Sequence, residues 1–173
     1  ISHDHRGAII SAFPNGTLSH EPADDAFFGL AQEADIPVAV HIGSFTARNT
    51  NRPSGDWNTL QFIGQAIGPR CGSGTIEAAL SLIFSGIFEK FPRLKLLLVE
   101  ANIGWIPCML EQSDDFFLRY RWFTNAVEQM PTMPSKTFHR NFWVSFMQDA
   151  AGLEMRHHMN LDHLMFSTDY PHT

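Results

Sequence analysis

The stretch IPVAVH, residues 36–41, points to the fold class, because it is a short apolar run that ends in a histidine. Its largely β-branched composition is typical of a strand whose two faces are both covered. Two further apolar runs, residues 94–99 and 164–167, resemble it, and each is followed closely by an acid. The sequence therefore predicts buried strands that deliver polar side chains at one end.

Strand and helix patterns alternate on both sides of this stretch. The predicted strands cover residues 7–12, 36–40, 94–99, 141–146 and 164–167. The predicted helices begin at Pro22, at Ile76 and at Trp105, and a short fourth helix runs from Asp149 through His157. Polar loops are expected from Gly43 to about Gly74 and around Pro131 and Pro134. This alternation favours an α/β fold with a parallel sheet and crossover helices.

Composition excludes several classes of protein. The chain has 173 residues, 44% of them apolar, and a net charge of −6. Its basic residues are scattered, so we expect no nucleic-acid partner. No apolar stretch is long enough to cross a bilayer, and the first residues lack a signal peptide, so we expect no membrane partner. Cys71 and Cys108 form no CxxC motif, which favours a reducing, cytoplasmic setting. The sequence leaves open whether the protein forms a homo-oligomer.

The chain begins without a methionine, almost directly on a strand, and stops soon after an aspartate at a strand end. We therefore expect residues 1–173 to be part of a longer protein.

Four groups of polar side chains follow the predicted strands. They are His41, Glu100, the pair Gln148–Asp149, and Asp169. In α/β barrels the chemistry lies at the carboxyl ends of the strands, and imidazole with carboxylate suits a divalent metal. Each residue also has a structural interpretation. His41 could be a hydrogen-bonded loop residue, Glu100 could cap or pair with an arginine, and Asp169 could shape a turn.

Two other histidine groups are assigned no function. The segment His3-Asp4-His5 resembles a metal-binding pair, but it precedes a strand, so its side chains should lie at the wrong end of the sheet. His157 and His158 fall at a helix end, where they suit the helix dipole and the last carbonyls.

Three segments carry a resemblance to a known family. They are DAFF to IPVAVHIG (25–43), GIFEKFPRLK (86–95) and DHLMFSTDYPH (162–172). In this order they resemble the amidohydrolase-related barrels, which include aminocarboxymuconate semialdehyde decarboxylase. The resemblance implies an incomplete (β/α)8 TIM barrel, about strands four to eight.

The resemblance also implies roles for individual residues. His41 falls on a metal-ligand position, and Asp169 on the aspartate that ligates the metal and assists proton transfer. His172 falls on a histidine often found after that aspartate, and we assign it to substrate binding. Strand six of many members ends in a histidine, where this chain has Glu100. The HxH or ExH pair of strand one has no counterpart in this chain.

The leading hypothesis is a metal-dependent hydrolase acting on a small carbonyl or carboxylate substrate. A divalent metal, which we expect to be zinc, would activate a water and polarise the substrate. Asp169 would transfer the proton, Glu100 would share the base role, and Arg48 would hold a substrate carboxylate, as Arg52 and Arg70 could. The alternative is a non-oxidative decarboxylase of the same family. A second alternative is an inactive barrel fragment, and we predict that residues 1–173 alone are inactive.

Overall fold

The computed structural model describes residues 4–45 and 60–172, and its centre is a sheet of five parallel strands. The strands are β1 (Ala8–Ile10), β2 (Val38–His41), β3 (Leu96–Val99), β4 (Phe142–Phe146) and β5 (Leu164–Phe166). They lie side by side in chain order. Val40 is level with Ile10 on one side and with Leu98 on the other. Every connection therefore crosses from one strand to the next parallel strand, which confirms the predicted topology.

The helices fill these connections. The α-helices are α1 (Asp25–Glu33), α2 (Leu60–Arg70), α3 (Thr75–Ile83), α4 (Ile87–Lys90), α5 (Ile106–Thr124), α6 (Ala126–Gln129), α7 (Pro134–Asn141) and α8 (Ala150–Glu154). Three 3₁₀ turns are η1 (Pro22–Asp24), η2 (Arg156–His158) and η3 (Leu161–His163). Among the described residues, no helix combines the length and apolar character needed to span a membrane.

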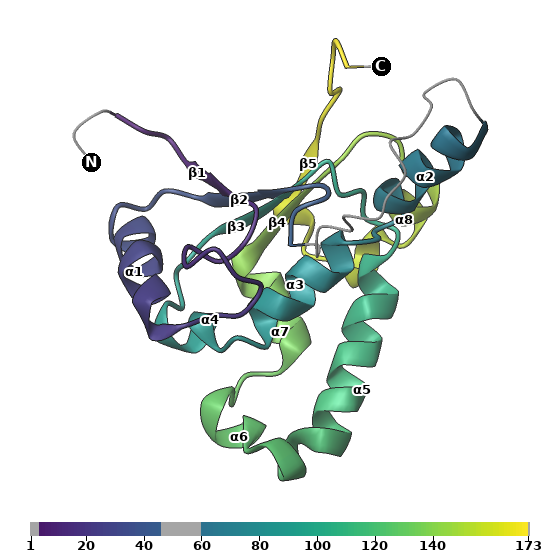
Figure 1. Ribbon diagram of the computed structural model, residues 1–173. Coiled ribbons are helices and arrows are strands. Elements are labelled where there is room, and N and C mark those ends of the chain that lie inside the picture. The colour runs from purple at the N-terminus through teal and green to yellow at the C-terminus, as the bar shows by residue number, and fades with distance from the viewer. Residues whose placement is uncertain (1–3, 46–59, 173) are drawn as a thin grey trace.

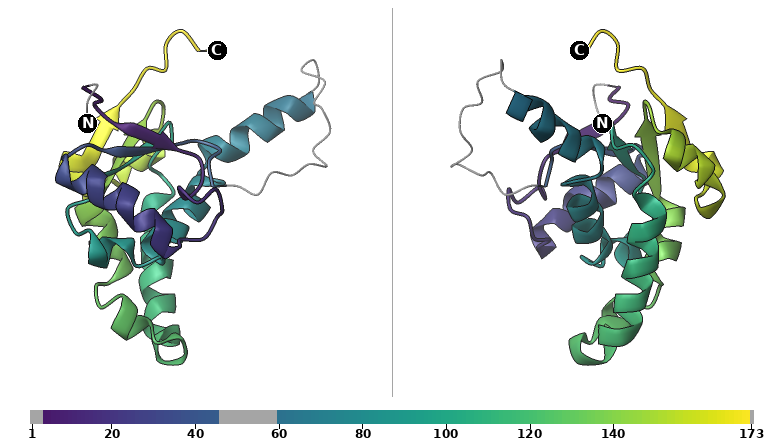
Figure 2. Two further views of the ribbon diagram at one scale, coloured as in Figure 1. Left: turned by 60° about the vertical axis from the view of Figure 1, so that its left-hand side comes forward. Right: turned by 90° about the vertical axis from the view of Figure 1, so that its right-hand side faces the viewer.

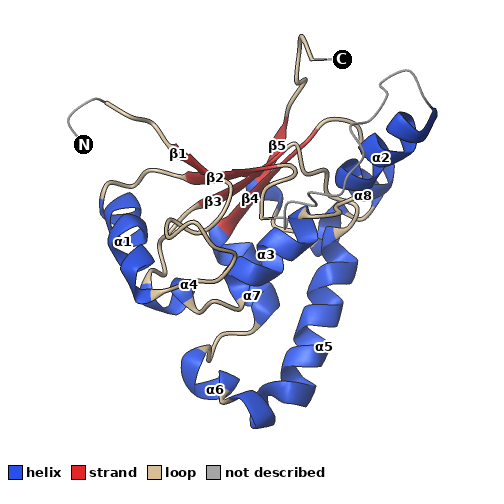
Figure 3. Ribbon diagram, viewed as in Figure 1, coloured by secondary structure: helices blue, strands red, loops and turns tan. Residues whose placement is uncertain are grey.

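One face of the sheet is covered by helices. In Figures 1 and 3, α1, α3, α4 and α7 all lie on the same side of the strands. The side chains pointing to this layer are at most 2% exposed: Val38, Val40, Leu96, Leu98, Phe142 and Val144. Burial of each such side chain contributes about 1.5–3 kcal/mol, so this layer holds the sheet together. Figure 2 shows α5 and α6 extending away from the sheet.

The opposite face is also apolar but is less covered. Ala39, Leu97 and Trp143 alternate with the buried residues and are half-buried, and Ile9 on β1 is 75% exposed. Apolar side chains on both faces of a parallel sheet are typical of a barrel, where the second face forms the interior. The strands therefore carry apolar side chains on both faces, as expected for the strands of a barrel.

The structure corrects three predictions about the connections. The expected loop from Gly43 to Gly74 contains α2, whose Gly64, Gly68 and Pro69 obscure its apolar pattern. The expected loop around Pro131 and Pro134 contains α7, which Pro134 begins. The single helix expected from Ile76 is divided into α3 and α4, because Gly86 adopts a left-handed conformation with φ 76°.

Candidate active site

The three residues singled out at the strand ends all lie at the carboxyl edge of the sheet. His41 is the last residue of β2, Glu100 directly follows β3, and Asp169 lies three residues beyond β5. Because the strands are parallel, these ends share one edge, which is where α/β barrels carry their chemistry.

His41 and Glu100 are in direct contact. Nε2 of His41 lies 2.7 Å from Oε1 of Glu100, and Nδ1 lies 3.0 Å from the carbonyl oxygen of Ile42. A carbonyl can only accept, so Nδ1 carries a proton and donates it to Ile42. This bond fixes the ring and turns Nε2 toward the carboxylate. The pair is open to solvent on the histidine side, since the side chain of His41 is 46% exposed and that of Glu100 16%.

The backbone around Glu100 is held in an unusual conformation. Its φ is 59°, in the left-handed region that few non-glycine residues adopt. The amide of Glu100 donates to Oγ of Ser145 on β4 at 2.9 Å, and the amide of Ala101 donates to the Ser145 carbonyl at 3.1 Å. Buried Ser145 therefore fixes the turn that aims Glu100 at His41.

Asp169 lies in a second cluster at the same edge. The amide of Ser167 donates to the Phe146 carbonyl, which continues the pairing of β5 with β4. Beyond it the chain turns at Asp169, with φ 54°, and the amide of His172 donates back to the Asp169 carbonyl at 2.8 Å. Nδ1 of His172 lies 3.9 Å from Oδ2 of Asp169, whose side chain is 19% exposed. The structure thus places the His172 side chain beside that of Asp169.

A cavity of about 370 Å³ opens beside Asp169. Its lining residues are Arg70, Met147, Gln148, Phe166, Ser167, Thr168, Asp169 and His172. Cavities of a few hundred Å³ are the usual size of small-molecule sites. His41 and Glu100 are not among its lining residues, so the described residues form two clusters along one edge.

The donor atoms of His41 and Glu100 fit a divalent metal. Two neighbouring ligands of one ion, each about 2.1 Å from it, are separated by about 3 Å, close to the spacing of this nitrogen and oxygen. The Nδ1 contact with the Ile42 carbonyl is the arrangement in which Nε2, and not Nδ1, would face a metal. In residues 4–45 and 60–172, however, no three His, Cys, Asp or Glu side chains gather closely enough to hold an ion together. The described part thus offers two neighbouring side chains of the type that ligates metals, with Asp169 farther along the same edge.

Asp149 has a structural role. Its carboxylate accepts hydrogen bonds from the amides of Ile103 at 2.6 Å, Gly104 at 2.7 Å and Gly152 at 2.8 Å. It therefore caps α8, as predicted, and also holds the loop after β3. Gln148, its neighbour in sequence, lines the Asp169 cavity.

The other candidates lie elsewhere. His5 precedes β1 and lines a cavity with Gly7 and Phe27, at the opposite end of that strand. His157 and His158 form η2, with ring centroids 4.3 Å apart, before β5 begins. Arg48 and Arg52, expected to contact substrate, and His3 lie outside the described residues.

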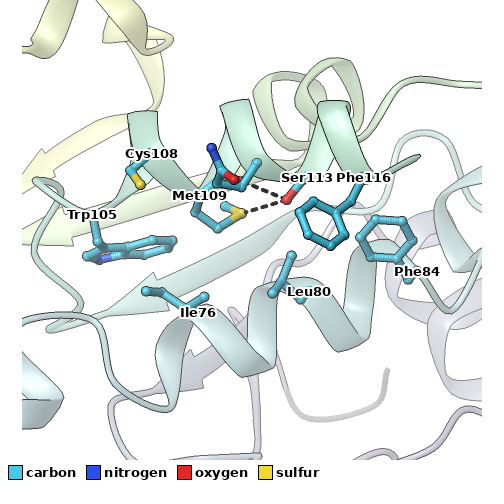
Figure 4. A pocket seen from close by; sticks show the side chains of 9 residues that line it. Ile76, Leu80, Phe84, Trp105, Cys108, Met109, Ser113 and Phe116 are labelled. Carbon is cyan, nitrogen blue, oxygen red and sulfur yellow. Dashed lines mark hydrogen bonds between the residues drawn. The ribbon is translucent and has the colours of Figure 1, made fainter. Parts of the chain in front are cut away.

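A larger apolar groove of about 560 Å³ lies between α3 and α5. Figure 4 shows Ile76 and Leu80 on one side and Trp105, Met109 and Phe116 on the other, with Ser113 bonded to Met109. Among its described lining residues the titratable side chain is Cys108, and none of them is charged. The chemistry is therefore better placed at the polar strand ends than in this larger groove.

Arg70 is one of three arginines in the expected loop from Gly43 to Gly74, and the sequence did not distinguish it from the other two. The structure places it at the end of α2, on the wall of the Asp169 cavity. No sequence signal separates it from Arg48 and Arg52, because its position depends on the fold of α2.

Comparison with known proteins identifies the family. A family model described as amidohydrolase matches residues 6–173. A curated relative, decarboxylase orsB of Emericella nidulans, is 25% identical over 171 residues, which cover 95% of this chain and 50% of that protein.

Solved structures share the fold. The 5-carboxyvanillate decarboxylase LigW from Sphingomonas paucimobilis superposes with a TM-score of 0.68 at 20% identity, over 96% of this chain and 48% of its own. A second structure is that of a dihydroxybenzoic acid decarboxylase from Polaromonas sp. JS666, solved with bound manganese and 2-nitroresorcinol. It gives a TM-score of 0.57 at 20% identity, over 87% of this chain and 44% of its own. The chain thus spans about half the length of these relatives. The five strands are part of a (β/α)8 barrel, and the chain belongs to the amidohydrolase family of enzymes.

Proposed function

We propose that the complete protein is a metal-dependent carboxy-lyase, which removes CO₂ from a small carboxylic acid without an oxidant. The observation that carries the proposal is the cavity of about 370 Å³ at the end of β5, with the Asp169 carboxylate in its wall. The decarboxylases named above support it, since this reaction unites relatives that differ in their substrates. The sequence favoured hydrolysis, and the comparisons favour its alternative.

His41 and Glu100 would hold the metal at one side of the site, and Asp169 at the other. When bound, the metal supplies positive charge that orients the substrate and stabilises negative charge on its oxygens. Glu100 and Asp169 give oxygen ligands beside a single imidazole, a donor set that suits manganese or magnesium as well as zinc. We therefore expect manganese to support activity, although the sequence pointed to zinc.

Asp169 would carry the proton of the reaction. The bond between the carboxyl group and its carbon breaks, the electron pair stays on that carbon, and the carbon gains a proton as CO₂ leaves. Protonated Asp169 would donate that proton and regain one from water, so that each turnover consumes one proton. His172, 3.9 Å from Asp169, would contact the same substrate.

Hydrolysis is the second candidate function, and the Glu100 carboxylate is the observation that favours it. An acceptor 2.7 Å from His41 at the sheet edge could take a proton from an attacking water. The two reactions use the same residues but give different products.

Product analysis separates them. The complete protein, loaded with manganese, is incubated with hydroxylated aromatic carboxylic acids and, separately, with simple esters, lactones and amides. The proposal predicts CO₂ release that EDTA abolishes and manganese restores. Hydrolysis of the second group without any CO₂ from the first would reject it. Residues 1–173 alone remain predicted to be inactive in both assays.

A further inference from the structure

Arg70 is fixed at the carboxyl edge of the sheet by its backbone. It is the last residue of α2, and its carbonyl accepts a hydrogen bond from Nδ2 of Asn102 at 3.1 Å. Oδ1 of Asn102 in turn accepts from the amide of Met147 at 3.3 Å. Asn102, only 9% exposed, therefore connects the end of α2 with the loops after β3 and β4. Arg70 is thus anchored to the sheet although its side chain is exposed.

The side chain of Arg70 reaches toward the cavity beside Asp169. Its Nη1 lies 3.7 Å from Sδ of Met147, and both residues line that cavity. Among the lining residues that the structure describes, Arg70 alone carries a permanent positive charge. Phe166 and Met147 form apolar parts of the wall, and Asp169 and His172 form the polar part.

Most N–H donors of the Arg70 guanidinium have no acceptor among the described residues. The guanidinium has five N–H donors, and the one side-chain acceptor that the structure shows for it, among the described residues, is the weakly accepting Met147 sulfur. The described residues also give it no ion pair. Planar carboxylates bind such a group through two parallel hydrogen bonds.

We propose that Arg70 is the carboxylate-binding residue of the cavity, and that it holds the carboxylate of a small aromatic acid whose ring lies against Phe166. This inference rests on the proposed function for the nature of the substrate. It changes the earlier assignment, which named Arg48 for this role and Arg52 and Arg70 as residues that could share it. An arginine here would set the orientation of the acid, with the carboxyl-bearing carbon on the Asp169 side of the cavity.

The contact between Arg70 and the substrate carboxylate should affect substrate binding more than the chemical step. As CO₂ forms, the negative charge moves from the carboxylate oxygens to the carbon that is left behind, so a bond between Arg70 and those oxygens is strongest before the reaction. Loss of Arg70 should therefore raise KM and the Kd of carboxylate ligands without lowering kcat.

The test is calorimetric binding to the complete protein with two probes, 2,6-dihydroxybenzoate and 1,3-dihydroxybenzene, which differ by the carboxylate. Binding is measured on the manganese-loaded protein and again after metal removal, for the parent protein, R70Q, R70K and R119Q. Arg119 is a matched control, since its pair with Asp115 lies on the exposed face of α5. Because the Arg70 side chain is exposed, R70Q should fold, and its melting temperature checks this.

R70Q is expected to weaken binding of the carboxylate probe by about 10- to 100-fold, as for hydrogen bonds between charged groups, with the neutral probe unchanged. R70K should give an intermediate loss and R119Q none. Equal affinity of the parent and R70Q for the carboxylate probe, or no preference of the parent for that probe, would overturn the inference. Carboxylate binding lost in R70Q but without CO₂ release in any assay would uphold the anion site and reject the proposed reaction instead.

Discussion

Nε2 of His41 lies 2.7 Å from Oε1 of Glu100, so the ends of β2 and β3 are joined by a polar contact at the sheet edge. Ser145 on β4 holds Glu100 in place through the Glu100 amide. Three consecutive strands thus position one nitrogen and one carboxylate. The contact between His41 and Glu100 makes the pair a candidate for metal binding, which neither residue alone would suggest.

Glu100→Gln tests whether the carboxylate binds metal. Glutamine keeps the size and the acceptor that faces His41, but removes the negative charge. We expect the Kd for Mn²⁺, measured by calorimetry on the complete protein, to rise about 10-fold or more, as for loss of a close metal partner. Glu111→Gln on exposed α5 is the control. An unchanged Kd in Glu100→Gln would leave Glu100 outside the metal site.

Asp169→Asn tests the proton carrier. Asparagine tolerates the left-handed backbone that Asp169 adopts, so the turn should persist. Loss of a general acid lowers rates by about 100- to 10,000-fold, and we expect a fall of that size in kcat. Asp115→Asn, which removes an exposed carboxylate from α5, should leave kcat within about threefold. Retention of most activity by Asp169→Asn would reject the assignment.

The strands and the residues at their ends could be predicted from sequence because their pattern is local. Buried apolar runs end at His41, close to Glu100 and shortly before Asp169, and the structure keeps all three at one edge. The helix α7 was missed because Pro131 and Pro134 resemble loop punctuation, although proline also begins helices. Arg70 was not singled out because its place at the cavity depends on Asn102, a contact across 32 positions of the chain.

Asp149→Ala should destabilise the fold. Three backbone amides would lose their acceptor, those of Ile103, Gly104 and Gly152. Loss of charged hydrogen bonds of this kind costs about 3 kcal/mol in the free energy of unfolding. Urea unfolding measures it, with Glu154→Gln as the control. A loss below about 1 kcal/mol would mean that water replaces the carboxylate at these amides.

His139 should make stability depend on pH. Burial lowers the pKa of its imidazole below the ordinary 6.5, an effect that nearby Asp114 opposes and His163 adds to. As the pH falls below 6.5, the unfolded chain therefore takes up a proton before the folded chain does, and the free energy of unfolding decreases. His139→Gln should reduce the decrease between pH 7.5 and 5.5 in urea unfolding. His157→Gln, at an exposed site, should not, and equal pH dependence of the parent and His139→Gln would contradict this.

The most direct test of the proposed reaction is proton NMR of the products formed by the complete protein with manganese in D₂O. Decarboxylation assisted by Asp169 predicts a product that lacks the proton signal of the carbon that lost its carboxyl group, because that carbon gains a deuteron, and one CO₂ released per product. Formation of this product and release of CO₂ should both be lost in Asp169→Asn or after EDTA. Products of hydrolysis without CO₂, or the same turnover with EDTA present, would contradict a metal-dependent carboxy-lyase.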